Sequence, residues 1–203
     1  NLQVLARENV AWELTGQVAT NKDEVVSLGD LPFAGTTFRR SVVGYPIGGM
    51  WSKRVVSADR DPVTSAISNV LCDGGPGNAP VACGAAPEVF IGTPTPKVTG
   101  AVSSTVTLFD RLSVYGLLDI KRGHKLLNAN ETNRCGALLP LCDANYNPAG
   151  YETNYLASLS RLSGGPAVIQ GAFMQDASFV RLAEVSVTYQ LPSRFVSGIG
   201  ASG

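Results

Sequence analysis

The sequence predicts an all-β chain of long antiparallel strands. The main observation is a strict alternation of apolar and polar residues in four windows of nine to eleven residues. Composition supports it, because charged residues make up only 16% of the chain, against about 25% in an ordinary soluble domain. The 16 basic and 16 acidic side chains also balance, which excludes the basic surface of a nucleic-acid-binding protein.

The first window is Val10–Thr20, in which even-numbered apolar positions alternate with mostly polar odd-numbered ones. Trp12 and Leu14 share one face, and Glu13 and Gln17 share the other. A period of two residues is the signature of a strand whose two faces meet different surroundings. The sequence therefore predicts a half-polar strand over this whole window.

Three later windows repeat the pattern. Val98–Leu108 and Leu112–Arg122 alternate over their full length, and the three residues between them predict a tight hairpin turn. The fourth window covers residues 183–191, with Val and Tyr on one face and Glu, Ser, Thr and Gln on the other. A short link is expected after it, over residues 191–193, because Pro192 has no N–H to donate to a ladder.

Elsewhere the alternation is weaker. Between the first and second windows it predicts only a short strand over residues 24–28 and another over residues 39–51. Residues 57–96 and 123–177 are predicted to be long irregular connections.

Strand length distinguishes a membrane barrel from a soluble sandwich. Soluble strands average about five or six residues, whereas membrane-spanning strands need about 9–11 and alternate apolar-out with polar-in. The sequence thus predicts that residues 1–203 form an antiparallel up-and-down sheet, part of a transmembrane β-barrel. A large secreted all-β domain with one solvated face is the alternative. Aromatic residues in or beside the windows are expected to form an interfacial girdle: Trp12, Tyr115, Phe179, Tyr189 and Phe195.

The four cysteines lie in two close pairs within the long connections. Cys72 is followed by Cys83, and Cys135 by Cys142, in segments rich in Gly, Pro, Asn and Ala. Two local disulfides in an oxidising compartment are the favoured interpretation. Zinc ligands usually stand two to four residues apart, so gaps of ten and six make a metal site the weaker alternative, and reduced thiols a third. Long extracellular loops and short periplasmic turns are typical of outer-membrane barrels, which places both pairs outside the cell.

Candidate sites for chemistry are few. The only histidine, His124, has no partner at ligand spacing, no nucleophilic triad can be assembled, and no phosphate-binding motif is present. Asp143 begins a calcium-loop pattern that fails at Pro148, where a turn glycine is needed. The sequence therefore predicts no enzyme, no metal and no cofactor.

Three loop tyrosines are the candidate contacts. Tyr146, Tyr151 and Tyr155 could stack on sugar rings or anchor a partner protein; alternatively, they pack their loop onto itself.

No signal peptide and no run of 18 apolar residues is visible, and residues 197–203 close no element. The chain is therefore expected to be a fragment of a longer protein.

Four segments, in order along the chain, resemble SusC/RagA-type TonB-dependent outer-membrane transporters. Residues 176–192 (DASFVRLAEVSVTYQLP) are similar to a late barrel segment of that family. Residues 92–97 (GTPTPK) resemble its Gly-x-Pro-x-Pro segment, residues 43–49 (VGYPIGG) its Gly-x-Pro-Ile-Gly element, and residues 20–26 (TNKDEVV) the preceding strand end.

The resemblance implies an outer-membrane importer of a glycan, peptide or similar nutrient. It implies a plug domain inside a 22-stranded barrel, energy from the TonB system through that plug, a SusD-like surface lipoprotein and contact with outer-membrane lipid. The plug and the closing strands are not recognisable in this sequence, so the expectation is a partial barrel domain, and no functional residue is carried over. A secreted or surface-anchored all-β adhesion domain remains the alternative function.

Overall fold

The computed structural model describes residues 1–36, 38–136, 141–159 and 169–192. The chain divides into two compact units, which are described separately. The first unit contains Asn1–Asn21, Pro96–Arg122 and Ser178–Gly203, and the second contains Lys22–Thr95 and Gly123–Ala177. No helix among the described residues is long and apolar enough to cross a membrane.

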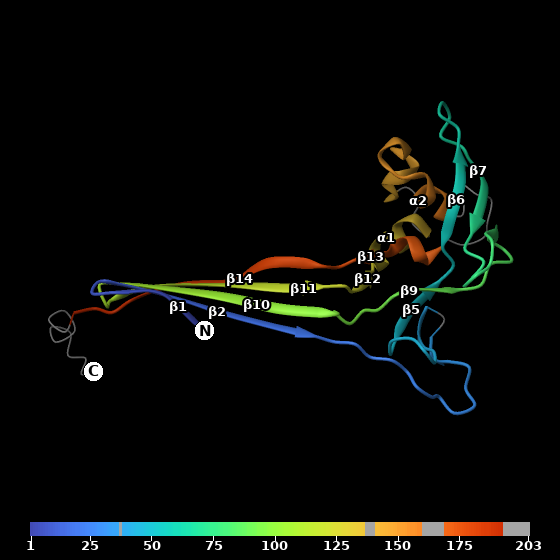
Figure 1. Ribbon diagram of the computed structural model, residues 1–203. Coiled ribbons are helices and arrows are strands. Elements are labelled where there is room, and N and C mark those ends of the chain that lie inside the picture. Colours follow the sequence, from blue (N-terminus) through green and yellow to red (C-terminus); the bar gives the residue numbers. More distant parts are fainter. Residues whose placement is uncertain (37, 137–140, 160–168, 193–203) are drawn as a thin grey trace. The chain divides into compact units, whose positions relative to one another are not determined.

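The first unit is a single antiparallel sheet of five strands in the order β1-β2-β10-β11-β14 (Figure 1). Its strands are β1 (Leu2–Arg7), β2 (Val10–Thr20), β10 (Val98–Leu108), β11 (Leu112–Arg122) and β14 (Phe179–Tyr189). The all-β antiparallel fold class is confirmed, and β2, β10 and β11 have the predicted bounds. The strand β1 is an addition, since alternation over its six residues is too short to stand out.

Short and long connections leave this sheet at opposite ends. The turn between β10 and β11 places Phe109 and Asp110 at φ of 53° and 55°, the left-handed region that tight hairpin turns use. The N–H of Arg111 donates to the carbonyl of Leu108 at 3.1 Å and closes the turn. The β1–β2 turn lies at the same end, because Val10 pairs with Leu108. Both long connections therefore start and return at the other end.

The strand register gathers the apolar residues on one face. Residues directly opposite one another in paired strands point to the same side of a sheet. A row is the set of residues that lie opposite one another across β2, β10, β11 and β14. Every second row contains only apolar residues, apart from one serine. These five rows are Val10–Leu108–Leu112–Tyr189, Trp12–Val106–Val114–Val187, Leu14–Ser104–Gly116–Val185, Gly16–Val102–Leu118–Leu182 and Val18–Gly100–Ile120–Val180. The intervening rows carry mostly Ser, Thr, Gln and charged residues, so the sheet has one apolar and one polar face.

A β-bulge explains why the fourth strand begins earlier than predicted. In the β11–β14 pair, Leu117 is opposite Glu184 and Leu118 is opposite Leu182, so Ala183 is an extra residue. The bulge shifts the alternation of β14 by one position, and Val180 stays on the apolar face although its number is even. A search for unbroken alternation stops at this bulge.

The residues predicted for an aromatic girdle do not share one face of the sheet. Trp12 and Tyr189 lie on the apolar face, in the two rows nearest the short turns. Tyr115 and Phe179 lie on the polar face, opposite Ser186 and Lys121. Phe195 lies outside the described residues, as does Ser193 in the predicted link after β14. Alternation determines the face on which a residue of a strand lies. Position near a strand end alone was therefore insufficient to predict which aromatic residues share a face.

Over the residues that the structure describes, the second unit contains three small antiparallel sheets (Figure 1). One has four strands, β3 (Ala34–Gly35), β4 (Arg39–Ser41), β5 (Gly49–Ser52) and β9 (Val89–Gly92). The next has three, β6 (Val55–Arg60), β7 (Ile67–Cys72) and β8 (Val81–Ala82). The last pairs β12 (Lys125–Leu127) with β13 (Met174–Asp176).

Two α-helices and three short 3₁₀ turns complete the described part of this unit. The helices are α1 (Ala129–Gly136) and α2 (Thr153–Ser158). The 3₁₀ turns are η2 (Asp143–Asn145), η3 (Pro148–Gly150) and η4 (Gln170–Phe173).

The prediction of long irregular connections is wrong, because the first forms strands and the second forms strands and helices, and both contribute to one core. The core includes Leu156 and Phe173, both fully buried, together with Val55 and Ile67. Residues 24–28 do not form a strand: Val25 makes two backbone hydrogen bonds with a loop, to Gly44 and Tyr45. Residues 39–51 form two strands, β4 and β5, around a turn, instead of one. Short strands of two to six residues are too brief for alternation to be recognised.

Both cysteine pairs form disulfides in this core, Cys72 with Cys83 and Cys135 with Cys142. Cys72 and Cys142 are completely buried, and Cys135 is nearly so. We expect non-reducing peptide mass spectrometry to recover these two pairs and no exchanged pairing. Closing loops of this length stabilises a fold by about 2–3 kcal/mol each. Free thiols at all four positions in the protein isolated from cells would contradict both the pairing and the oxidising compartment.

Candidate functional site

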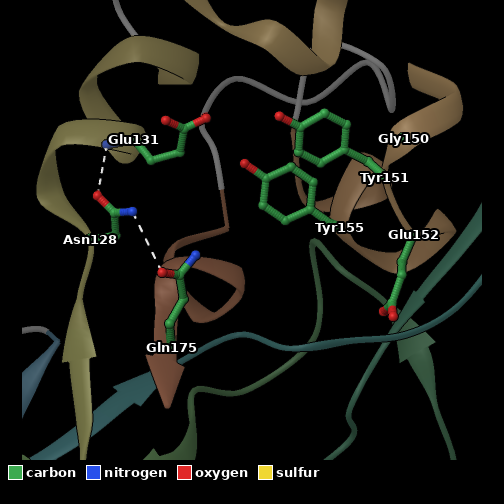
Figure 2. A pocket seen from close by; sticks show the side chains of 7 residues that line it. All are labelled: Asn128, Glu131, Gly150, Tyr151, Glu152, Tyr155 and Gln175. Atoms are coloured by element: carbon green, nitrogen blue, oxygen red, sulfur yellow. Dashed lines mark hydrogen bonds between the residues drawn. The ribbon is translucent and has the colours of Figure 1, made fainter. Parts of the chain in front are cut away.

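The second unit contains a pocket of about 460 Å³ between α1, α2 and the β12–β13 pair (Figure 2). Its lining combines two aromatic rings with polar and acidic groups. The lining residues are Asn128, Glu131, Gly150, Tyr151, Glu152, Tyr155 and Gln175. All of them come from residues 128–175, the second of the two long connections.

One side of the pocket is set by the start of α1. The Asn128 side-chain oxygen accepts the N–H of Glu131 at 3.1 Å, so Asn128 caps this helix. Glu131 lies in the first helical turn, where the helix dipole stabilises a negative charge. The Asn128 amide also donates to Gln175 at 3.5 Å, which joins α1 to β13. These contacts hold two amides and one carboxylate along this side.

The opposite side is an aromatic wall. Tyr151 and Tyr155 stack with ring centroids 5.1 Å apart, and Tyr155 packs edge-on against Phe173 at 5.7 Å. Arg60 of β6 donates to the carbonyl of Tyr151 at 3.1 Å and anchors this segment to the three-stranded sheet. Figure 2 shows the hydroxyl ends of both tyrosines directed toward Glu131. The pair is therefore held on a rigid support by packing behind it.

The surroundings of both tyrosines raise the pKa of their phenols above the ordinary value. The Tyr151 hydroxyl donates to the Asp143 carboxylate at 2.9 Å, and this hydrogen bond raises the pKa of Tyr151. Burial raises the pKa of Tyr155 to about 12, with the charge of Glu131 adding to it. At neutral pH both phenols are thus neutral, and the Tyr151 hydroxyl is a hydrogen-bond donor to a carboxylate.

The structure brings two of the three predicted tyrosines together. Tyr151 and Tyr155 line the pocket, but they also pack on each other and on the core, as the alternative interpretation of loop packing expected. Tyr146 is 70% exposed and does not line this pocket.

Other lining residues were not found from the sequence. The Asn-x-x-Glu spacing of Asn128 and Glu131 is a helix-start signal that could have located α1. Gln175 had no usable signal, because its position depends on the pairing of β12 with β13 across 47 residues.

The described residues include one group of potential metal ligands, Glu131 with Cys135 and Cys142. Their ligand atoms lie within 4.8 Å of one another. The two cysteines are joined in a disulfide, however, so neither offers a thiolate. This group therefore does not constitute a metal site.

A second hollow of about 500 Å³ lies beside an aromatic cluster of Tyr45, Trp51 and Phe90. The Arg54–Asp73 ion pair forms part of its lining. The rings pack against one another, and the ion pair is internally balanced. The third charged residue of the lining, Glu88, pairs with Arg40 at 2.8 Å, so each charge of the hollow already has an opposite partner.

Comparison with known proteins shows the fold. No family model matches the chain, and no curated protein does. Among solved structures the chain is similar to a chain of the RagAB peptide importer in its 'closed-closed' state, with a TM-score of 0.69 and 18% identity over 97% of this chain. The 'open-open' state gives 0.66 at 17% identity over 97%, and the RagAB peptide transporter gives 0.63 at 18% over 96%.

In all three cases this chain spans 22% of the length of the solved chain. Nearly the whole of this chain therefore shares the fold of about a fifth of a RagAB chain.

Proposed function

We propose that this chain is a wall segment of the β-barrel of a SusC/RagA-type TonB-dependent outer-membrane transporter, which imports a glycan, a peptide or a similar nutrient. The observation that carries the proposal is the aligned apolar face of the five-stranded sheet. Soluble sheets bury such a face, yet Val18, Val185 and Val187 are 75%, 61% and 65% exposed. A lipid surface is the environment that suits a broad, exposed apolar face.

The dimensions of the sheet support the same proposal. Its four long strands have eleven residues each. Eleven residues extend about 36 Å, and a tilt of about 40° reduces their height to about 28 Å, close to the apolar band of an outer-membrane barrel. The fold shared with a RagAB chain, over almost the whole sequence, is consistent with this role.

The polar face would then line the lumen. It carries the ion pair of Arg181 with Asp119 at 3.0 Å, among Ser, Thr and Gln side chains of the neighbouring rows. Energy coupling through TonB and a plug, and a SusD-like lipoprotein as partner, belong to the proposal as properties of the whole transporter.

The second unit would stand on the extracellular side. Long connections of outer-membrane barrels lie outside, and both long connections leave the sheet at one end. Two disulfides fit an oxidising exterior. We assign Tyr146, Tyr151 and Tyr155 on this unit to contact with the nutrient or the lipoprotein.

The test is the location and heat-modifiability of the protein expressed from its full reading frame. We expect it to fractionate with the outer membrane, to need detergent for extraction and to change gel mobility on boiling, as folded barrels do. A freely soluble protein without heat-modifiable mobility would contradict the proposal and favour a surface adhesion domain that binds through the same unit.

A further inference from the structure

The pocket beside Tyr151 and Tyr155 has the chemistry of a site for a cation. We propose that it binds the positively charged side chain, guanidinium or ammonium, of a peptide. The inference rests on the proposed function in taking this pocket as a contact surface of a nutrient importer, and it specifies the class of ligand there.

Charge is the first argument. Glu131 and Glu152 are both in the lining, and no lysine or arginine is among the described residues that form it. Figure 2 shows the two carboxylates on either side of the tyrosine pair. Arg134 lies 3.6 Å from Glu131, but its side chain is 57% exposed and outside the lining, and such surface pairs contribute little. The lining therefore has a net negative charge that a neutral ligand would leave uncompensated.

The aromatic wall is the second argument. A cation is attracted to the face of a tyrosine ring by about 0.5–2 kcal/mol. Burial raises the pKa of Tyr155 and the hydrogen bond to Asp143 raises that of Tyr151, so both rings are neutral at pH 7 and can accept a cation on a face. An alkyl-guanidinium also brings methylene groups that can pack against the rings. A simple metal ion or a small anion would use neither property.

The amides are the third argument. Asn128 and Gln175 lie on the same side of the pocket as Glu131, and their mutual hydrogen bond is long at 3.5 Å. Amide oxygens accept hydrogen bonds from guanidinium or ammonium N–H groups. A cationic side chain therefore meets acceptors on one side and rings on the other. A sugar could use the rings and the amides, and its hydroxyls could donate to the carboxylates, but it would leave their negative charge unneutralised.

The experiment compares two peptides on the purified, detergent-solubilised full-length protein. The pentapeptide Ala-Ala-Arg-Ala-Ala is compared with the same peptide carrying citrulline, which keeps the shape of arginine but is neutral. We expect the citrulline peptide to bind about tenfold more weakly by calorimetry. Addition of salt should weaken only the arginine peptide. Equal binding of the two peptides would overturn the inference.

Two variants locate the site. Glu152→Gln, at an exposed position, should weaken the arginine peptide about fivefold and leave the citrulline peptide unchanged. Glu24→Gln makes the same chemical change at an exposed position of the second unit outside the pocket, and should change neither. Equal effects of the two variants, or displacement of the arginine peptide by a neutral oligosaccharide, would overturn the inference.

The outcome is independent of the test of the proposed function. A heat-modifiable outer-membrane protein that binds both peptides equally overturns only the cation site. A freely soluble protein that prefers arginine overturns only the transporter.

Discussion

Leu118→Arg on β11 should prevent stable insertion of the proposed barrel, whereas Leu117→Arg should be tolerated. Leu118 lies in the apolar row with Gly16, Val102 and Leu182, and is 40% exposed. An arginine on the lipid face near the midplane costs about 2–4 kcal/mol. We therefore expect a large loss of heat-modifiable protein from the outer membrane, measured by gel mobility with and without boiling.

Leu117 provides a closely matched control. It is the same residue type in the same strand, one position away, and lies on the polar face opposite Ser103 and Glu184. An arginine there points to the hydrated side and can pair with Glu184, so the amount of folded protein should stay near that of the unmodified chain. If both variants insert equally well, or both fail, the assignment of the two faces is contradicted.

Phe173→Ala should unfold the second unit while leaving barrel insertion intact. Phe173 is completely buried and packs against Tyr155 in the core that also contains both disulfides. Truncation of a buried phenylalanine to alanine costs about 3–5 kcal/mol, a large share of the stability of a small unit. Hydrogen exchange on the detergent-solubilised protein should show loss of amide protection across α2, β6 and β7.

Phe38→Ala serves as the comparison in the same unit. Phe38 is 37% exposed, and its truncation should cost less than 1 kcal/mol and leave amide protection unchanged. Loss of protection that spreads to β10 and β11 in the Phe173 variant would show that the two units do not fold separately. Equal protection in the two variants would show that Phe173 is not central to the core.

The sheet could be predicted from sequence because each long strand carries its own signal. Alternation between chemically different faces fixed β2, β10 and β11 to the residue, and the turn at Phe109 and Asp110 was short enough to join two of them. The bulge at Ala183 interrupts the alternation of β14, so the prediction missed the first four residues of this strand.

The second unit could not be predicted in this way. Its strands are short, and its core depends on contacts between residues far apart in sequence, such as Arg60 with Tyr151. The cysteine spacing did indicate both disulfides, because each closes a short local loop. Two tyrosines of the pocket were singled out in the sequence as loop aromatics. Gln175 and Glu152 were not, because they line the pocket only when α2 and β13 fold against α1.

The most direct test of the central claim is a spin-label scan along β11 in outer membranes. The four cysteines of residues 1–203 are all in disulfides, so a single cysteine introduced at each position from Ser113 to Lys121 can carry a nitroxide once any free cysteine elsewhere in the protein is replaced by serine. Collision with oxygen, which concentrates in lipid, is compared with collision with a water-soluble nickel chelate. We predict a period of two, with Val114, Leu118 and Ile120 accessible to oxygen and Ser113, Leu117 and Asp119 accessible to the chelate. Accessibility without this period, or with the two faces reversed, would contradict the claim that this sheet is a barrel wall facing lipid.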